Sequence, residues 1–110
     1  QQMAIDAIKP GKRTREIDAV ARDHIAQKGF KGSFGHGLGH GVGLAVHEAP
    51  SLGPVAEKEK IISENMVFTV EPGIYVPDKG GVRLENMVVV RSHGAEVFNQ
   101  LAIHMDKAAI

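Results

Sequence analysis

Three of the six histidines in this 110-residue chain lie close together in a glycine-rich segment. The segment reads Phe34-Gly-His36-Gly-Leu-Gly-His40-Gly-Val-Gly-Leu-Ala-Val-His47-Glu48, with glycine at every second position from 35 to 43. If it is extended, the glycines share one face and His36 and His40 point to the other. Glycines in such a strand or loop let another backbone or a ligand approach closely. His47 has the opposite parity, so a bend is needed before it can join the other two imidazoles.

The glycine spacing excludes two familiar nucleotide-binding loops. Neither Gly-x-Gly-x-x-Gly nor Gly-x-x-x-x-Gly-Lys-Ser/Thr occurs in the segment, and both need glycines at positions that other residues fill here. The zinc-protease motif His-Glu-x-x-His is also absent, because His47-Glu48 is followed by Ala49-Pro50-Ser51. These sites are therefore excluded, and each histidine taken alone is also compatible with a hydrogen-bonded structural role.

Two glutamates stand where a strand does not normally carry a carboxylate. Glu71 ends an apolar run, and Glu85 interrupts another one. Arg83 and Glu85 are two residues apart, so they should share one strand face, with Val82 and Leu84 on the other. A buried carboxylate needs a cation, which can be an arginine or a metal ion. Each glutamate alone is compatible with a solvated face or an Arg83–Glu85 pair, whereas one imidazole with two carboxylates also suits Mn, Co, Fe or Zn.

The elements that must position these residues begin with helices. A short helical stretch precedes Pro10-Gly11, and a second helix is expected from about Thr14 to Lys28, with Thr14 as its N-cap. Gly29 follows as a helix stop. The apolar stripe of the second helix consists of Ile17, Val20, Ala21 and Ile25.

Beyond residue 31 the sequence predicts short strands separated by turn residues. The predicted strands are Met66–Val70, Gly73–Val76, Val82–Glu85 and Met87–Val90. Pro77–Gly81 predicts a turn, and the charged stretch Val55–Glu64 predicts a surface connection. Helices followed by antiparallel strands indicate an α+β fold.

The composition excludes several classes of protein. Thirteen basic residues balance 13 acidic ones, so charge gives no support for nucleic-acid binding. Cysteine is absent, which rules out disulfides and thiolate metal ligands. No apolar run approaches the roughly 20 residues that span a bilayer, and the first residues do not resemble a secretory signal. We therefore expect a cytoplasmic protein with no membrane or nucleic-acid partner.

Three spaced motifs occur in a fixed order between about Phe34 and Val90. They are Gly-His-Gly-x-Gly-His-x-x-Gly-Leu-x-Val-His-Glu-x-Pro, Met-Val-Phe-Thr-Val-Glu-Pro-Gly-Ile-Tyr and Gly-Val-Arg-x-Glu. Together they resemble the Xaa-Pro aminopeptidase and prolidase branch of the pita-bread metallopeptidases. Methionine aminopeptidases share that fold, but their second motif is less similar. The resemblance implies half of a pita-bread fold, with helices packed on a curved antiparallel sheet.

The resemblance also implies a dinuclear metal site. His40, Glu71 and Glu85 would be metal ligands, with Glu85 bridging two divalent ions, Mn or Co first and Zn or Fe as alternatives. The family needs two further aspartates upstream, and the helical residues Asp6 and Asp18, like Asp23, are poor substitutes. Residues 1–110 are therefore expected to be a C-terminal fragment of the catalytic domain, inactive alone.

The remaining roles implied by the resemblance concern substrate and proton transfer. His47 would contact the scissile carbonyl, His36 would line the substrate site, and Arg83 would bind or orient groups beside the carboxylates. Glu71 would also relay a proton to the leaving nitrogen. The expected partners are a peptide with proline at its second position, the missing N-terminal half of the domain, and further copies of the protein in a homo-oligomer.

Two alternatives remain open, and one departure from the family pattern is noted. The domain could be an inactive binding or scaffold module, or a metal-free hydrolase of the creatinase kind; relatives of the first kind usually lose ligand residues. Asn65 stands where the family more often has glycine. Asparagine also tolerates a left-handed backbone, so little should change.

Overall fold

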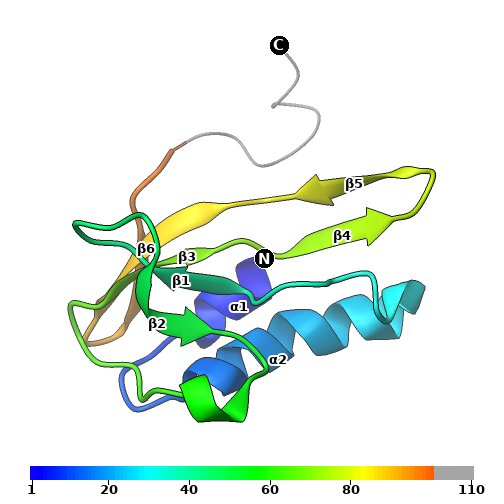
Figure 1. Cartoon of the computed structure of the whole chain (residues 1–110). Coiled ribbons are helices and arrows are strands. Elements are labelled where there is room, and N and C mark those ends of the chain that lie inside the picture. The colour runs from blue at the N-terminus through cyan, green and yellow to red at the C-terminus, as the bar shows by residue number, and fades with distance from the viewer. Residues whose placement is uncertain (101–110) are drawn as a thin grey trace.

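The computed structural model describes residues 1–100 as helices lying beside antiparallel strands (Figure 1). The helical elements are α1 (Gln2–Ala7), α2 (Thr14–Ile25), a π-helical turn (Ala26–Phe30) and a 3-10 turn (Ala56–Lys58). The strands are β1 (Gly39–Gly41), β2 (Glu48–Leu52), β3 (Val67–Val70), β4 (Gly73–Val76), β5 (Gly80–Arg83), β6 (Asn86–Arg91) and β7 (Gly94–Val97). The predicted α+β class is confirmed.

Five strands form one sheet in the order β2-β1-β3-β6-β7, and every neighbouring pair is antiparallel. The β4–β5 hairpin is a separate two-stranded ribbon. In Figure 1 both helices lie along one side of the larger sheet, and the ribbon projects beyond the sheet, over the C-terminal half of α2. The ribbon joins the sheet at two points, between β3 and β4 and between β5 and β6.

The core lies between the helices and the five-stranded sheet. Strand alternation sorts the residues of β3, because successive side chains point to opposite faces. Phe68 and Val70 are fully buried in the core, which leaves Thr69 between them on the other face. The buried apolar cluster comprises Ala4, Ile5, Ile8, Ile17, Ala21, Ile25, Phe34, Leu38, Leu52, Ile62, Phe68, Val70, Val88 and Val90.

The second helix differs from the prediction at its start and agrees at its end. Arg13, not Thr14, is the N-cap, so the Thr14 prediction was wrong. Thr14 is fully buried, and its hydroxyl accepts a hydrogen bond from the Lys60 amide at 3.1 Å instead of capping the helix. Gly29, with φ of 92°, ends the helical stretch as expected. Glycine takes this positive φ without strain, because it has no Cβ atom.

The predicted strands are present with shifted bounds. The strand expected at Val82–Glu85 is β5, which ends at Arg83, so Glu85 lies in the break before β6. β1 lies in the glycine-rich segment that was expected to be a strand or a loop, whereas β2 and β7 were not predicted. The stretch Val55–Glu64 is mainly exposed, as expected, although Ile62 is buried in the core.

Two backbone predictions are confirmed in the loops. Asn65 has φ of 68°, the left-handed conformation that asparagine was expected to tolerate. The turn between β4 and β5 contains Asp78 with φ of 60°. Both residue types adopt this region more readily than most others.

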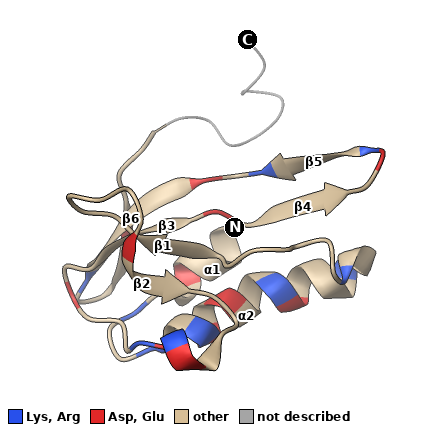
Figure 2. Ribbon diagram, in the orientation of Figure 1, with Lys and Arg blue, Asp and Glu red and all other residues tan. Residues whose placement is uncertain are grey.

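Charges of both signs are interspersed along the described residues (Figure 2). Figure 2 shows blue and red segments alternating on α2 and in the loops, without a large area of one sign. None of the helices within residues 1–100 is long and apolar enough to cross a bilayer.

Candidate active site

A cavity of about 620 Å³ opens on the face of the sheet that is turned away from the core. Its lining includes every predicted site residue except His36. The lining residues are His40, Val42, Val46, His47, Thr69, Glu71, Arg83, Glu85, Met87 and Asn99. Segments far apart in the sequence thus meet at one cavity.

Three adjacent strands contribute the floor of this cavity. His40 lies in β1, Thr69 in β3 and Met87 in β6, and Thr69 is paired directly with Met87. The amide of His40 donates a hydrogen bond to the Thr69 hydroxyl at 3.1 Å. Phe68, Val70 and Val88 point into the core beside Thr69 and Met87, so strand alternation directs Thr69 and Met87 to the cavity. His40 lies between two glycines, and its ring lines the same cavity.

The glycines on either side of His40 permit a very close strand approach. A Cβ atom on Gly39 would lie 1.9 Å from the carbonyl oxygen of Thr69, and one on Gly41 would lie 2.0 Å from that of Ala49. No side chain fits at such distances. The close backbone approach expected from the alternating glycines is confirmed at these two positions.

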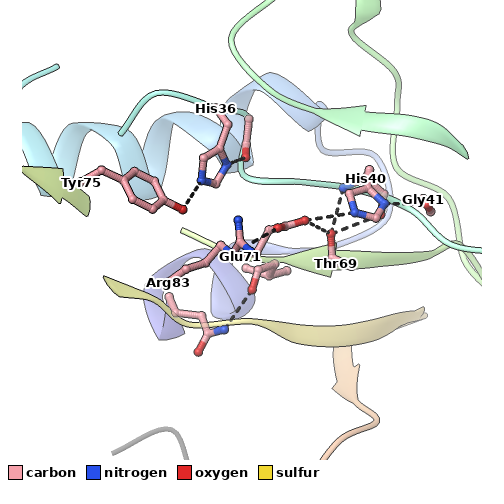
Figure 3. Close-up of polar contacts among 10 residues, drawn as sticks. His36, His40, Gly41, Thr69, Glu71, Tyr75 and Arg83 are labelled. Carbon is pink, nitrogen blue, oxygen red and sulfur yellow. Dashed lines mark hydrogen bonds and ion pairs between the residues drawn. The ribbon is translucent and has the colours of Figure 1, made fainter. Parts of the chain in front are cut away.

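His40 and Glu71 are in direct contact (Figure 3). The His40 Nε2 atom lies 3.1 Å from Glu71 Oε1. The Thr69 hydroxyl donates to the same carboxylate oxygen at 2.7 Å. His40 Nδ1 lies 2.9 Å from the Gly41 carbonyl oxygen and must donate to it, because a carbonyl only accepts. The contact between Nε2 and the carboxylate oxygen is therefore favourable when Nε2 also carries a proton. It is also favourable when Nε2 and the carboxylate oxygen bind the same cation.

Both predicted glutamate ligands lie where the sheet gives way to the ribbon. Glu71 follows β3, and its amide donates to the Leu38 carbonyl at 2.7 Å. Glu85 occupies the break between β5 and β6. Both glutamates lie outside the strands, so strand alternation does not determine the direction of their carboxylates. Leu38 ties this junction to the glycine-rich segment.

Arg83 lies near Glu71 and on the same side as Glu85. Its Nε atom is 4.0 Å from Glu71 Oε2. Arg83 and Glu85 both line the cavity, whereas Val82 and Leu84 line a separate depression beside α2. The predicted division of these four residues between two faces is confirmed.

The predicted bend that returns His47 to the site is present. Residues 43–47 form a series of bends between β1 and β2, and the Ala45 amide donates to Glu48 Oε2 at 3.2 Å. The rings of His47 and His40 have centroids 4.2 Å apart and are inclined by 51°. His47 is exposed at the cavity edge, where a bound molecule could reach it.

His36 lies outside the cavity lining and makes a different contact. Its Nδ1 donates to the Gly37 carbonyl at 2.8 Å, and its Nε2 lies 2.8 Å from the Tyr75 hydroxyl, whose proton it accepts when the ring is neutral (Figure 3). Tyr75, on β4, was part of a quoted motif but had no predicted role. The sequence also gave Thr69 no role, although a hydroxyl two residues before Glu71 shares its strand face.

The chemistry of the donors fits part of a metal site. His40 contributes an imidazole nitrogen and Glu71 a carboxylate, and Glu85 adds a second carboxylate at the same cavity. Such nitrogen and oxygen donors suit Mn, Co, Fe or Zn. Within residues 1–100, however, no three His, Cys, Asp or Glu side chains are grouped closely enough to hold an ion. The three predicted ligands share a cavity, but only two of them touch.

Comparison with known proteins gives consistent matches. The sequence model of metallopeptidase family M24 matches residues 1–92. The chain is 44% identical over 110 residues to the Bacillus subtilis peptidase YqhT, covering all of this chain and 30% of that protein. It is 45% identical over 96 residues to the Xaa-Pro dipeptidase of Pyrococcus furiosus, covering 87% of this chain and 27% of that protein.

The fold is similar to that of solved prolidases. The structure of the Xaa-Pro dipeptidase from Bacillus anthracis matches with a TM-score of 0.83 and 46% identity, over 87% of this chain and 26% of that one. The expected pita-bread architecture is confirmed by this similarity. The chain spans between about a quarter and a third of the length of these relatives.

Proposed function

Because this chain belongs to metallopeptidase family M24, we propose that it is the C-terminal part of the catalytic domain of a metal-dependent exopeptidase that hydrolyses Xaa-Pro bonds. The enzyme would be an aminopeptidase or a dipeptidase. The observation that carries this proposal is the 3.1 Å contact between His40 and Glu71 at a cavity also lined by Glu85 and His47. The Xaa-Pro dipeptidases among the relatives support the substrate class.

His40, Glu71 and Glu85 would hold two divalent ions, with Glu85 as the bridging ligand and two aspartates supplied by an upstream half-domain. Manganese or cobalt is the first candidate, and zinc or iron is the alternative. Such ions supply Lewis-acid activation of the scissile carbonyl and of the attacking water. The Nδ1–H tautomer of His40, fixed by the Gly41 carbonyl, leaves Nε2 free to act as the ligand atom.

The other side chains would bind and orient the peptide. His47, exposed at the cavity edge beside His40, would donate a hydrogen bond to the oxygen of the reacting carbonyl. His36 and Arg83 would contact the substrate. Glu71 would transfer a proton to the leaving nitrogen of proline, which needs that proton to depart.

The substrate would be a peptide with a free amino terminus and proline at its second position. The cavity has an apolar wall of Val42, Val46 and Met87, which suits the ring of proline. The upstream half-domain would close the other side of the cavity, and the complete protein would form a homo-oligomer.

The experiment is a complementation assay. The purified 110-residue chain is mixed with an Xaa-Pro dipeptide and excess Mn²⁺ or Co²⁺, first alone and then with an upstream half-domain that carries two aspartate ligands. Turnover is expected only in the mixture. Turnover by the chain alone would contradict the proposed division of ligands, and a complex with bound metal but no turnover would favour the alternative of a binding or scaffold module.

A further inference from the structure

A charged pair on α2, the buried Asp18 and the partly buried Arg22, lies beside the histidine segment. Asp18 is 1% exposed, and its carboxylate receives two hydrogen bonds from Arg22, from Nε at 2.7 Å and from Nη2 at 2.9 Å. Removing a carboxylate from water is costly unless it is paired and hydrogen-bonded. The two-point contact with a guanidinium meets that requirement in a defined geometry.

The pair also binds the backbone of the segment that contains His36. Arg22 donates from Nη1 to the Phe34 carbonyl at 2.8 Å and from Nη2 to the His36 carbonyl at 2.7 Å. Asp18 accepts from the Leu38 amide at 3.0 Å. The guanidinium carbon also lies 4.3 Å from the centre of the Phe34 ring. Three alternate residues of the segment are therefore held by two side chains of one helix.

These contacts bind backbone groups that no strand pairs. Residues 34–38 belong to no strand, with bends at His36 and Leu38, and β1 begins only at Gly39. Carbonyls and amides on alternate residues normally pair with an adjacent strand, and buried backbone groups need such partners. Arg22 supplies two donors and Asp18 one acceptor, and their backbone partners lie on alternate residues of the segment.

We infer that Asp18 and Arg22 are positioning residues that fix residues 34–38 and thereby set the orientation of the His36 ring and the entry into β1. Neither side chain is among the cavity-lining residues, so the pair acts through the segment that it holds. The effect on turnover rests on the proposed function, whereas the effect on His36 does not. Hydrogen bonding to Asp18 raises the pKa of Arg22 above its ordinary value, so the guanidinium stays positively charged.

A purely stabilising role makes a different prediction from a positioning role. Replacing a buried ion pair by apolar residues of similar size is often neutral for stability. The double variant Asp18→Leu/Arg22→Met removes the three hydrogen bonds to residues 34–38. It should keep the fold, because Phe34 and Leu38 still pack in the apolar cluster with α2, although the backbone groups that lose these bonds will lower stability. Arg22→Lys keeps the positive charge but lacks the planar fork that reaches Asp18 and two carbonyls together.

The test follows the histidine side chains by ¹⁵N NMR in the 110-residue chain. In its neutral form, wild-type His36 should carry the proton on Nδ1, as the contact with the Gly37 carbonyl requires, and accept from Tyr75 at Nε2. Arg22→Lys and the double variant should lose this signature while circular dichroism shows retained secondary structure. In the complemented enzyme, kcat/KM should fall roughly 10- to 100-fold, the range for residues that orient a site.

The matched control is Arg15→Lys, an arginine on the same helix with an exposed side chain. It should leave the His36 signature and turnover unchanged. An unchanged His36 signature in both Arg22→Lys and the double variant would overturn the inference, and so would unfolding of both, which would assign the pair a stabilising role alone. A wild-type chain with the expected His36 signature but no turnover after complementation would count only against the proposed function.

Discussion

Replacing Thr69 by valine should remove the hydrogen bonds that support His40 and Glu71, without adding or removing a charge. The Thr69 hydroxyl is buried and donates to Glu71 at 2.7 Å while accepting from the His40 amide at 3.1 Å. A hydrogen bond to a charged group contributes about 1.5–3 kcal/mol, and an unsatisfied buried amide costs about 1–3 kcal/mol. The Glu71 and His40 side chains are 12% and 22% exposed, so water will offset part of this loss. We expect unfolding free energy to fall by about 2–4 kcal/mol.

The same substitution should lower the affinity for metal in the complemented protein. Without the hydroxyl, the Glu71 carboxylate loses the contact that orients it toward His40, and loss of such a contact typically costs about 10- to 100-fold in metal affinity or activity. Urea denaturation of the chain measures stability, and titration of the complemented protein with Mn²⁺ measures affinity.

Thr14→Val is the matched control for this prediction. Thr14 is also buried, but its hydroxyl accepts one hydrogen bond, from the Lys60 amide, and touches no carboxylate. It should cost about 1–2 kcal/mol of stability and leave metal affinity unchanged. Equal destabilisation by the two variants, with unchanged metal affinity in Thr69→Val, would refute the reasoning.

Three further outcomes are expected. In the complemented enzyme, Glu85→Gln should lose metal and activity together, because an amide is a poor bridging ligand. His47→Ala should keep its metal and lose turnover. Elemental analysis measures the bound metal, and equal metal loss in both variants would make His47 a ligand or a structural support. Gly39→Ala should prevent stable folding, since its Cβ would lie 1.9 Å from the Thr69 carbonyl oxygen, whereas Gly35→Ala meets no atom within 4 Å and should be tolerated; thermal unfolding compares the two. Treatment of the complemented enzyme with a chelator should abolish turnover, and added Mn²⁺ should restore it; activity that survives chelation would support a metal-free hydrolase.

Local patterns in the sequence predicted most of the elements but not all of them. β3, β4 and β6 are rich in β-branched and aromatic residues, which is the composition that marks a strand. β1 is Gly-His-Gly and β2 contains Pro50, so neither carries that signal. β2 lies at the edge of the sheet, where proline is tolerated. The alternating glycines predicted a close backbone approach, but not that Thr69 and Ala49 would be the neighbours at Gly39 and Gly41.

Five of the six predicted site residues line the cavity, but the sequence did not predict their contacts. Side-chain alternation along one strand correctly placed Arg83 and Glu85 on one face and Val82 and Leu84 on the other. The contact of His40 with Glu71 instead depends on the pairing of β1 with β3, which parity cannot supply. The structure places Glu85 at the cavity without direct contact to them, so its role as a bridging ligand stays a prediction.

Asp18 shows how the sequence could have predicted more. It lies within the buried stripe of α2, next to Ile17 and one turn before Ala21, so its carboxylate had to be buried. A buried carboxylate needs a cation, and Arg22 at i+4 is placed to provide one. A guanidinium has five donors and the carboxylate uses two of them, so three remain for other acceptors. The histidine segment begins twelve residues after Arg22, and its carbonyls at Phe34 and His36 accept two of these donors.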